Sequence, residues 1–236
     1  MRIFENVGNP TFVERRVKRY EPPKIESQGR LLSSDPAEIR FLDLLGSIAL
    51  MILFGPLMLL IAMAVYVANP GPILFKQKRV GRYGRMFYCY KFRTMATDAE
   101  ARLEAVLASD PAARAEWERD HKLKNDPRIV GIGRFLRKSS LDELPQIFNV
   151  FKGEMSLVGP RPIVAAEKSK YGRYISYYCA VRPGITGLWQ INGRNDVSYR
   201  RRVAFDVIYA KKSKTVDYIR ILLMTVPSVL ASRGSY

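Results

Sequence analysis

The residues with the clearest capacity for chemistry form one stretch, Arg137–Gln146, in which two carboxylates, Asp142 and Glu143, stand side by side after two cations and two hydroxyls. A carboxylate can attack phosphorus or share a divalent cation, and nearby cations can neutralise phosphate oxygens. The same stretch also fits an ordinary helix start, because Ser140 and Glu143 have the spacing of a capping box. A catalytic role therefore needs support from the rest of the chain: a phosphorylated substrate, cations to hold it and a metal.

The amino-acid composition has the excess of lysine and arginine that a phosphate-binding site would need. The 236 residues include 39 Lys and Arg against 22 Asp and Glu, which gives a formal net charge of +17. Such an excess predicts an anionic partner, which could be nucleic acid, acidic lipid headgroups or phosphorylated substrates. The length suits one catalytic domain with an appendage.

The histidine and cysteine content argues against several kinds of site. The single histidine, His121, lies among the charged residues Arg119, Asp120 and Lys122 and is expected to be a solvated helix residue, which argues against a His-based catalytic triad. One histidine and two cysteines are also too few for a four-ligand His/Cys zinc site. They also make no disulfide framework, and the layout of a signal peptide is absent. We therefore expect a reducing compartment that faces the cytosol.

Arg161 is a candidate for holding a phosphate. It stands between Pro160 and Pro162, which stiffen the backbone, so its guanidinium group has less freedom to lose on binding. A surface ion pair is the alternative role. Downstream, Arg182–Gln190 combines turn-forming residues with a tryptophan, and functional residues concentrate on such loops.

A 25-residue segment, Leu44–Ala68, contains no charged residue. As a helix it is long enough to cross the apolar core of a bilayer. Gly55 and Pro56 interrupt its centre, and basic residues flank both ends. Because cytoplasmic flanks carry the excess of Lys and Arg, both ends favour the same side. We predict a re-entrant helix over residues 40–69, broken at Pro56, with a straight kinked span as the alternative.

The remaining segments predict a mostly helical α+β fold. Residues 1–39 are polar and proline-rich and are expected to form an extended arm. A short basic hairpin is predicted over residues 73–95; its alternating aromatic and basic residues suit either nucleic acid or a membrane surface. A pair of helices is expected over residues 97–124, with a break near Asp110-Pro111. Single helices are expected over residues 141–151, 163–180, 198–211 and 215–230, the last as an amphipathic helix in the core or at the membrane interface.

The sequence resembles the bacterial sugar transferase family, the monotopic phosphoglycosyl transferases, from about Arg40 to the C-terminus. Several motifs in the same order carry the resemblance: the apolar helix with its central proline, Gly71–Phe75, Lys91–Met95, Asp126–Gln146, Val158–Pro162 and Arg182–Gln190. The Gly-Leu-Trp-Gln sequence is similar to the branch that transfers hexose 1-phosphates for exopolysaccharide synthesis. Members of that branch often carry additional N-terminal transmembrane helices, which this sequence lacks. Members also commonly have Ser-Pro at the helix break, where this chain has Gly55-Pro56.

The resemblance implies a re-entrant membrane helix and a compact cytosolic catalytic domain, residues 70–236, at the bacterial inner membrane. The implied reaction transfers a sugar 1-phosphate from a nucleotide sugar, UDP-galactose or UDP-glucose, to polyprenyl (undecaprenyl) phosphate. Asp142 would be the nucleophile that forms a phosphosugar-aspartyl intermediate, and Glu143 its Mg²⁺-linked partner. Arg161 matches the family's phosphate-binding arginine. Four further cations are our candidates for phosphate contacts: Lys91, Arg93, Arg137 and Arg194.

Two other functions remain open from the sequence. A nucleic-acid-binding protein fits the charge, but the uncharged segment of 25 residues argues against it, so we expect membrane lipids and no nucleic acid as partners. The second alternative is a non-catalytic membrane adaptor of a polysaccharide assembly complex. The sequence does not fix the oligomeric state, and the N-terminal arm could reach a neighbouring copy.

Overall fold

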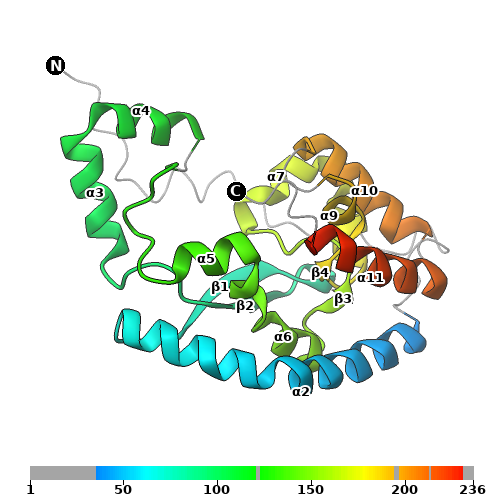
Figure 1. Ribbon diagram of the computed structural model, residues 1–236. Helices are drawn as coiled ribbons and strands as arrows, with labels where there is room; N and C mark the ends of the chain where they lie inside the picture. Colours follow the sequence, from blue (N-terminus) through cyan, green and yellow to red (C-terminus); the bar gives the residue numbers. More distant parts are fainter. Residues whose placement is uncertain (1–35, 121–122, 194–196, 213, 231–236) are drawn as a thin grey trace. The chain divides into compact units, whose positions relative to one another are not determined.

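The computed structural model describes residues 36–120, 123–193, 197–212 and 214–230. Within these ranges the fold is α+β and mostly helical, as predicted, and its strands form two small two-stranded sheets (Figure 1). The predicted arm, residues 1–39, lies outside the described residues except for its last four. The division of the chain into arm, membrane helix and catalytic domain stays a prediction.

The first described helix, α2 (Ala37–Ala68), contains the uncharged segment and continues through Pro56. The predicted break at Pro56 is therefore wrong for the helix itself. A proline removes one intrahelical hydrogen bond, which bends a helix more readily than it ends one when the flanking residues favour helix. The re-entrant path through a bilayer stays a prediction.

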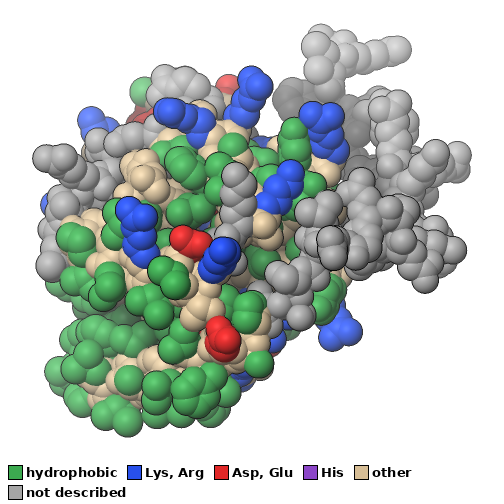
Figure 2. All heavy atoms as spheres, turned by 90° about the vertical axis from the view of Figure 1, so that its right-hand side faces the viewer, with side chains coloured by type: hydrophobic (Ala, Val, Ile, Leu, Met, Phe, Trp, Pro, Cys, Tyr) green, Lys and Arg blue, Asp and Glu red, His purple; other side chains and the backbone are tan. Residues whose placement is uncertain are grey.

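One stripe of α2 packs on the rest of the described chain, and most of its surface is exposed. Its buried residues recur every three to four positions within each half of the helix: Ile39, Asp43, Ser47, Met58, Ile61 and Val65. Large apolar side chains such as Ile52 and Leu59 are exposed, and Figure 2 shows hydrophobic side chains gathered at the bottom of its view, where α2 lies in Figure 1. Of the helices in the described ranges, α2 is the one long and apolar enough to cross a membrane. This exposed apolar surface indicates membrane association.

The predicted hairpin is confirmed as β1 (Leu74–Val80) and β2 (Met86–Phe92), joined through the short 3₁₀ turn η2 (Arg82–Gly84). The strands are antiparallel, with Phe75 opposite Lys91 and Arg79 opposite Phe87. Because side chains alternate between the two faces of a strand, Gln77, Arg79 and Lys91 share one face of the hairpin.

A second sheet pairs β3 (Ser156–Val158) in parallel with β4 (Gly184–Thr186), and this pairing was not predicted from the sequence. Each strand directly precedes residues of a motif: β3 leads into Pro160–Pro162, and β4 leads into Trp189. Gly184 is required there, because a Cβ atom at this position would lie 2.0 Å from the backbone nitrogen of Gly159. The pairing brings two segments that are far apart in the sequence to the same edge of the cleft described below.

The other helices surround these two sheets. The predicted helical pair over residues 97–124 is confirmed as α3 (Ala99–Ser109) and α4 (Pro111–Asp120), with the break at the predicted Asp110-Pro111. The one over 163–180 is divided into η4 (Ala165–Glu167), α7 (Lys168–Tyr171), η5 (Gly172–Tyr174) and α8 (Ile175–Ala180). α9 (Leu188–Ile191) is short, and the last two predicted helices are confirmed as α10 (Tyr199–Lys212) and α11 (Thr215–Leu230). The largest core cluster joins residues of α2, β2, α8, α10 and α11 around β3.

Candidate active site

The carboxylate pair lies in a short 3₁₀ turn, η3 (Leu141–Glu143), between α5 (Gly133–Ser139) and α6 (Gln146–Lys152). The predicted helix over residues 141–151 therefore starts late, at Gln146. The capping box is also wrong: Ser140 adopts a left-handed conformation (φ 57°) and makes no side-chain cap bond. Its conformation reverses the chain after α5, and the carboxylate of Glu143 is bound elsewhere.

Lys91 on β2 holds the two carboxylates together. Its Nζ donates a hydrogen bond to Glu143 Oε1 at 2.5 Å and lies 3.6 Å from Asp142 Oδ2. Asp142 is buried and Glu143 half-buried. The hairpin thus supplies a cation to a carboxylate pair that is about fifty residues away in the sequence.

The two carboxylates differ in their electrostatics. Burial raises the pKa of Asp142 above its usual value, and the neighbouring Glu143 raises it further, against the opposing effects of Lys91 and Arg137. Burial alone would also raise the pKa of Glu143, but Lys91, Arg161 and Arg79 outweigh it, so that its pKa is lowered. Glu143 is therefore the more readily ionised member of the pair, and Asp142 is the member destabilised in its ionised form.

Arg137 reaches the site from the end of α5. Its Nε donates a hydrogen bond to Thr94 Oγ1 at 2.8 Å, and its charge opposes the rise in the pKa of Asp142. Gly133 allows this approach, because a Cβ atom there would lie 2.3 Å from the carbonyl oxygen of Thr94. The sequence did not single out Thr94, although it lies within the Lys91–Met95 motif.

Arg161 also belongs to the site. Pro160 and Pro162 on either side of it are buried, whereas Arg161 is exposed and lines the same cleft as the carboxylates. Its charge lowers the pKa of Glu143. The prolines therefore anchor the backbone and leave the guanidinium group accessible.

Arg93 and Arg194 are the two remaining candidates for phosphate contacts. Arg93 lines the cleft, but its Nη2 donates to the carbonyl oxygen of Asn69, and its buried Nη1 has no hydrogen-bond partner among the described residues. Arg93 thus ties the end of α2 to the hairpin. Arg194 lies outside the described residues.

These side chains line a cleft of about 1810 Å³ that has a polar and an apolar part. The polar part contains the carboxylate pair and its cations. The apolar part is formed by Leu50 and Phe54 of α2, Trp189 of α9 and Leu222 and Val226 of α11. The sequence singled out Trp189 and the adjacent Gln190 as part of a loop motif and of the family resemblance, but not as lining residues of the site; the parallel pairing of β3 and β4 is what brings them here.

The carboxylate pair has the chemistry of a Mg²⁺ site that is completed by a substrate. Mg²⁺ prefers oxygen ligands and is commonly held by one or two carboxylates together with substrate phosphates and water. Asp142 and Glu143 supply such oxygens at the edge of the cleft. No cluster of three or more His, Cys, Asp or Glu residues occurs in the described ranges.

Comparison with known proteins gives consistent matches. The model of the family "Bacterial sugar transferase" matches residues 36–232. The undecaprenyl-phosphate galactose phosphotransferase of Salmonella typhimurium is 51% identical over 197 residues, which are 84% of this chain and 41% of that protein. The exopolysaccharide production protein ExoY of Sinorhizobium fredii is 46% identical over 197 residues, 84% of this chain and 87% of that protein.

A third relative is the UDP-glucose:undecaprenyl-phosphate glucose-1-phosphate transferase of Xanthomonas campestris pv. campestris, 41% identical over 201 residues, 82% of this chain and 38% of that protein. The chain thus spans about two fifths of the length of the Salmonella and Xanthomonas relatives. The family model covers most of the chain and all of the site described above, and the predicted resemblance is confirmed: the chain belongs to the bacterial sugar transferase family.

Proposed function

We propose that this chain transfers a hexose 1-phosphate from a UDP-hexose to undecaprenyl phosphate, in an initiating step of exopolysaccharide or related glycan synthesis. The observation that carries the proposal is the position of Asp142 and Glu143 against Lys91, in a cleft that is also lined by Arg161 and by apolar side chains of α2 and α11. A charged diphosphate and an apolar lipid chain need such neighbouring environments.

In the proposed reaction an oxygen of Asp142 attacks the phosphorus that bears the sugar. The bond from that phosphorus to the oxygen of UMP breaks, and UMP leaves with the bonding electrons. An oxygen of undecaprenyl phosphate then attacks the same phosphorus, the bond to Asp142 breaks, and the product is a hexose on undecaprenyl diphosphate. Division into two displacements means that the nucleotide sugar and the lipid do not have to be bound together.

The other residues of the site would hold and neutralise the phosphates. Lys91 keeps the carboxylate pair in place, and Arg161 and Arg137 offer cations to the phosphate oxygens. Bound Mg²⁺, held by Glu143 with Asp142 beside it, would supply further neutralisation of the diphosphate. The raised pKa of Asp142 makes it a better nucleophile when it is ionised, because an anion in a poorly solvated position gains more from bond formation.

The proposed location is the bacterial inner membrane, with the catalytic residues on the cytosolic side. For a re-entrant path, the continuous helix α2 would have to bend at Pro56, so that both of its ends lie on the cytosolic side and the cleft faces the level of the lipid phosphates. The positive charge of the chain supports contact with acidic headgroups. UDP-galactose and UDP-glucose are the proposed donors, since relatives are named for galactose and glucose transfer.

The test is release of UMP from a panel of nucleotide sugars by the purified protein in nanodiscs, with Mg²⁺ and with or without undecaprenyl phosphate. We expect UMP from UDP-galactose or UDP-glucose, and a loss of about a thousandfold or more in Asp142→Asn. Without the lipid, one equivalent of UMP should appear, and the protein should gain the mass of one hexose phosphate.

Asp110→Asn is the matched control. Asp110 is an exposed acid whose Oδ1 accepts hydrogen bonds from the amides of Ala112 and Ala113 at the start of α4, and asparagine caps a helix equally well. Normal turnover by Asp142→Asn would show that the nucleophile is misassigned. Absence of UMP from every nucleotide sugar with the wild-type protein would favour the non-catalytic adaptor.

A further inference from the structure

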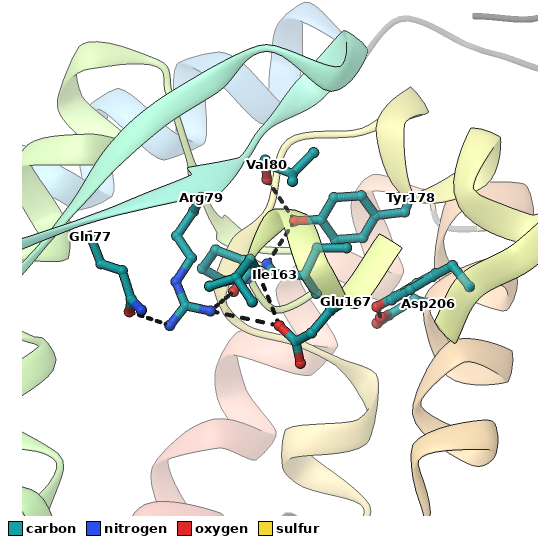
Figure 3. Close-up of polar contacts among 10 residues, drawn as sticks. Gln77, Arg79, Val80, Ile163, Glu167, Tyr178 and Asp206 are labelled. Carbon is teal, nitrogen blue, oxygen red and sulfur yellow. Dashed lines mark hydrogen bonds and ion pairs between the residues drawn. The ribbon is translucent and has the colours of Figure 1, made fainter. Parts of the chain in front are cut away.

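Arg79, which has no role in the proposed chemistry, connects the hairpin to the segment that carries Arg161. Its side chain is 13% exposed. Nη1 donates a hydrogen bond to the carbonyl oxygen of Pro162 at 2.9 Å, and Nη2 donates one to Gln77 Oε1 at 2.6 Å. Figure 3 shows the guanidinium group of Arg79 between Gln77 and Glu167, with dashed contacts to both.

The same segment is joined to the hairpin in two further ways. The amide of Val80 donates to the carbonyl oxygen of Ile163 at 2.9 Å. The hydroxyl of the buried Tyr178 donates to the carbonyl oxygen of Val80 at 2.7 Å and accepts a bond from the amide of Ile163 at 3.1 Å (Figure 3). The residues after Arg161 are therefore held at a fixed position against the end of β1.

Glu167 completes the arrangement around Arg79. Its Oε2 lies 3.8 Å from Arg79 Nη1 and accepts a hydrogen bond from the amide of Val164 at 3.0 Å. The carboxylate compensates a buried cation that lies close enough to Arg161 for the two charges to interact. A paired cation can be retained at such a position, whereas an isolated one would be costly.

The β1–β2 hairpin carries both Arg79 and Lys91, and so connects Arg79 and its partners to the carboxylates of Asp142 and Glu143. Arg79 and Lys91 are on the same face of the hairpin, and both line a small cavity of about 50 Å³ together with Glu143 and Arg161. One rigid element thus contacts the carboxylate pair through Lys91 and the Arg161 segment through Arg79.

We propose that Arg79 is a positioning residue that fixes Arg161 relative to Asp142 and Glu143, so that Arg161 meets the phosphates of the donor. This inference rests on the proposed function. An arginine is required, because its planar fork reaches the Pro162 carbonyl with one nitrogen and Gln77 with the other. A lysine has a single nitrogen and can keep only one of these contacts in the same geometry.

A double-mutant cycle tests the proposal. Arg79→Gln and Arg161→Gln should each raise the KM for the UDP-hexose by roughly tenfold, as expected for loss of a hydrogen bond that involves a charged group. Because Arg79 acts through Arg161, the double variant should be no worse than Arg161→Gln alone. Arg79→Lys should recover part of the loss. Multiplied effects in the double variant would overturn the proposal, since they would show two independent roles.

Arg82→Gln is the matched control. Arg82 is on the same hairpin and also donates to a carbonyl oxygen, that of Ala180, at 3.2 Å, but it lines neither the cleft nor the small cavity. We expect its KM to be close to that of the wild type. If Arg79→Gln does not fold, Gln77→Ala removes one acceptor of Arg79 and should raise the KM in the same direction.

Hydrogen–deuterium exchange gives a readout that is independent of activity. The amides of the non-proline residues in the range 159–165 should exchange faster in Arg79→Gln than in the wild type or Arg82→Gln; equal exchange would overturn the proposal. An unchanged KM in Arg161→Gln would overturn the proposed phosphate contact and this inference with it. A raised KM in Arg161→Gln but not in Arg79→Gln would overturn this inference alone.

Discussion

Lys91 and Glu143 form a hydrogen-bonded ion pair, with 2.5 Å between Nζ and Oε1. This contact places one ammonium group beside both carboxylates of the site, because Asp142 Oδ2 is only 3.6 Å from the same nitrogen. The pair is partly shielded from water, so its charges interact more strongly than those of a surface ion pair. A change at Lys91 should therefore alter both the geometry of the site and the ionisation of Asp142.

Lys91→Gln should lower activity and move the acid limb of the pH–rate profile to higher pH. Asp142 has to be ionised to attack, and Lys91 is the cation that most strongly opposes the rise in its pKa. Removal of that charge raises the pKa further, so a higher pH is needed for the active form. The measurement is kcat/KM for the UDP-hexose against pH, with Lys124→Gln, at an exposed lysine outside the cleft, as the control. An unmoved acid limb would contradict the assignment of Lys91.

Asp142→Asn should be more stable to heat than the wild type near neutral pH. The pKa of Asp142 is raised in the folded protein, so the folded state binds more protons than the unfolded state between the two pKa values. Stability therefore falls as the pH rises through the folded pKa, and the ionised group destabilises the fold at neutral pH.

Asparagine has no charge, so the substitution removes the free-energy cost of burying an ionised carboxylate. Each kcal/mol gained in the free energy of unfolding should raise Tm by about 2–4 °C. Thermal unfolding in detergent at several pH values measures the effect. The gain should shrink at acidic pH, where Asp142 is protonated in both states. A lower Tm for Asp142→Asn at neutral pH would mean that the ionised carboxylate stabilises the fold through Lys91.

Glu143→Gln should raise the Mg²⁺ concentration that gives half-maximal activity. The lowered pKa of Glu143 keeps it ionised at neutral pH, and an amide is a much weaker ligand than a carboxylate for a hard cation. Titration of UMP release with Mg²⁺ after treatment with a chelator measures this, and chelation alone should abolish wild-type activity. Glu100→Gln, on α3 at the edge of the same cleft, is the control. Full activity of the wild type after chelation would exclude the proposed Mg²⁺.

Cysteines introduced at both ends of α2 should be accessible from the same side of the membrane. Ala37→Cys and Pro72→Cys are at exposed positions, in a background in which Cys89 and Cys179 are serine. A re-entrant helix predicts that a membrane-impermeant thiol reagent labels both in inverted vesicles and neither in intact spheroplasts. Labelling of the two positions from opposite sides would establish a straight span and would fit the unbroken helix α2.

The sequence by itself determined the parts of this protein that depend on local chemistry. Side-chain alternation and turn residues placed the hairpin correctly, since β1 and β2 lie within residues 73–95. The motifs also identified Asp142, Glu143, Lys91, Arg137 and Arg161, all of which line one cleft. The local sequence pattern was misleading at Ser140 and Glu143, whose spacing fits a capping box. In the folded protein the carboxylate of Glu143 forms an ion pair with Lys91 and does not cap the helix.

Only the tertiary structure decided how distant segments meet. The parallel pairing of β3 with β4 depends on the close approach of Gly159 and Gly184, and short strands of three residues leave little periodicity in a sequence. The role of Arg79 was hidden for the same reason, because its acceptor is the backbone carbonyl of Pro162, and every residue has a carbonyl group. Side-chain types can be inferred from the order of residues, whereas contacts to backbone groups exist only once the chain has folded.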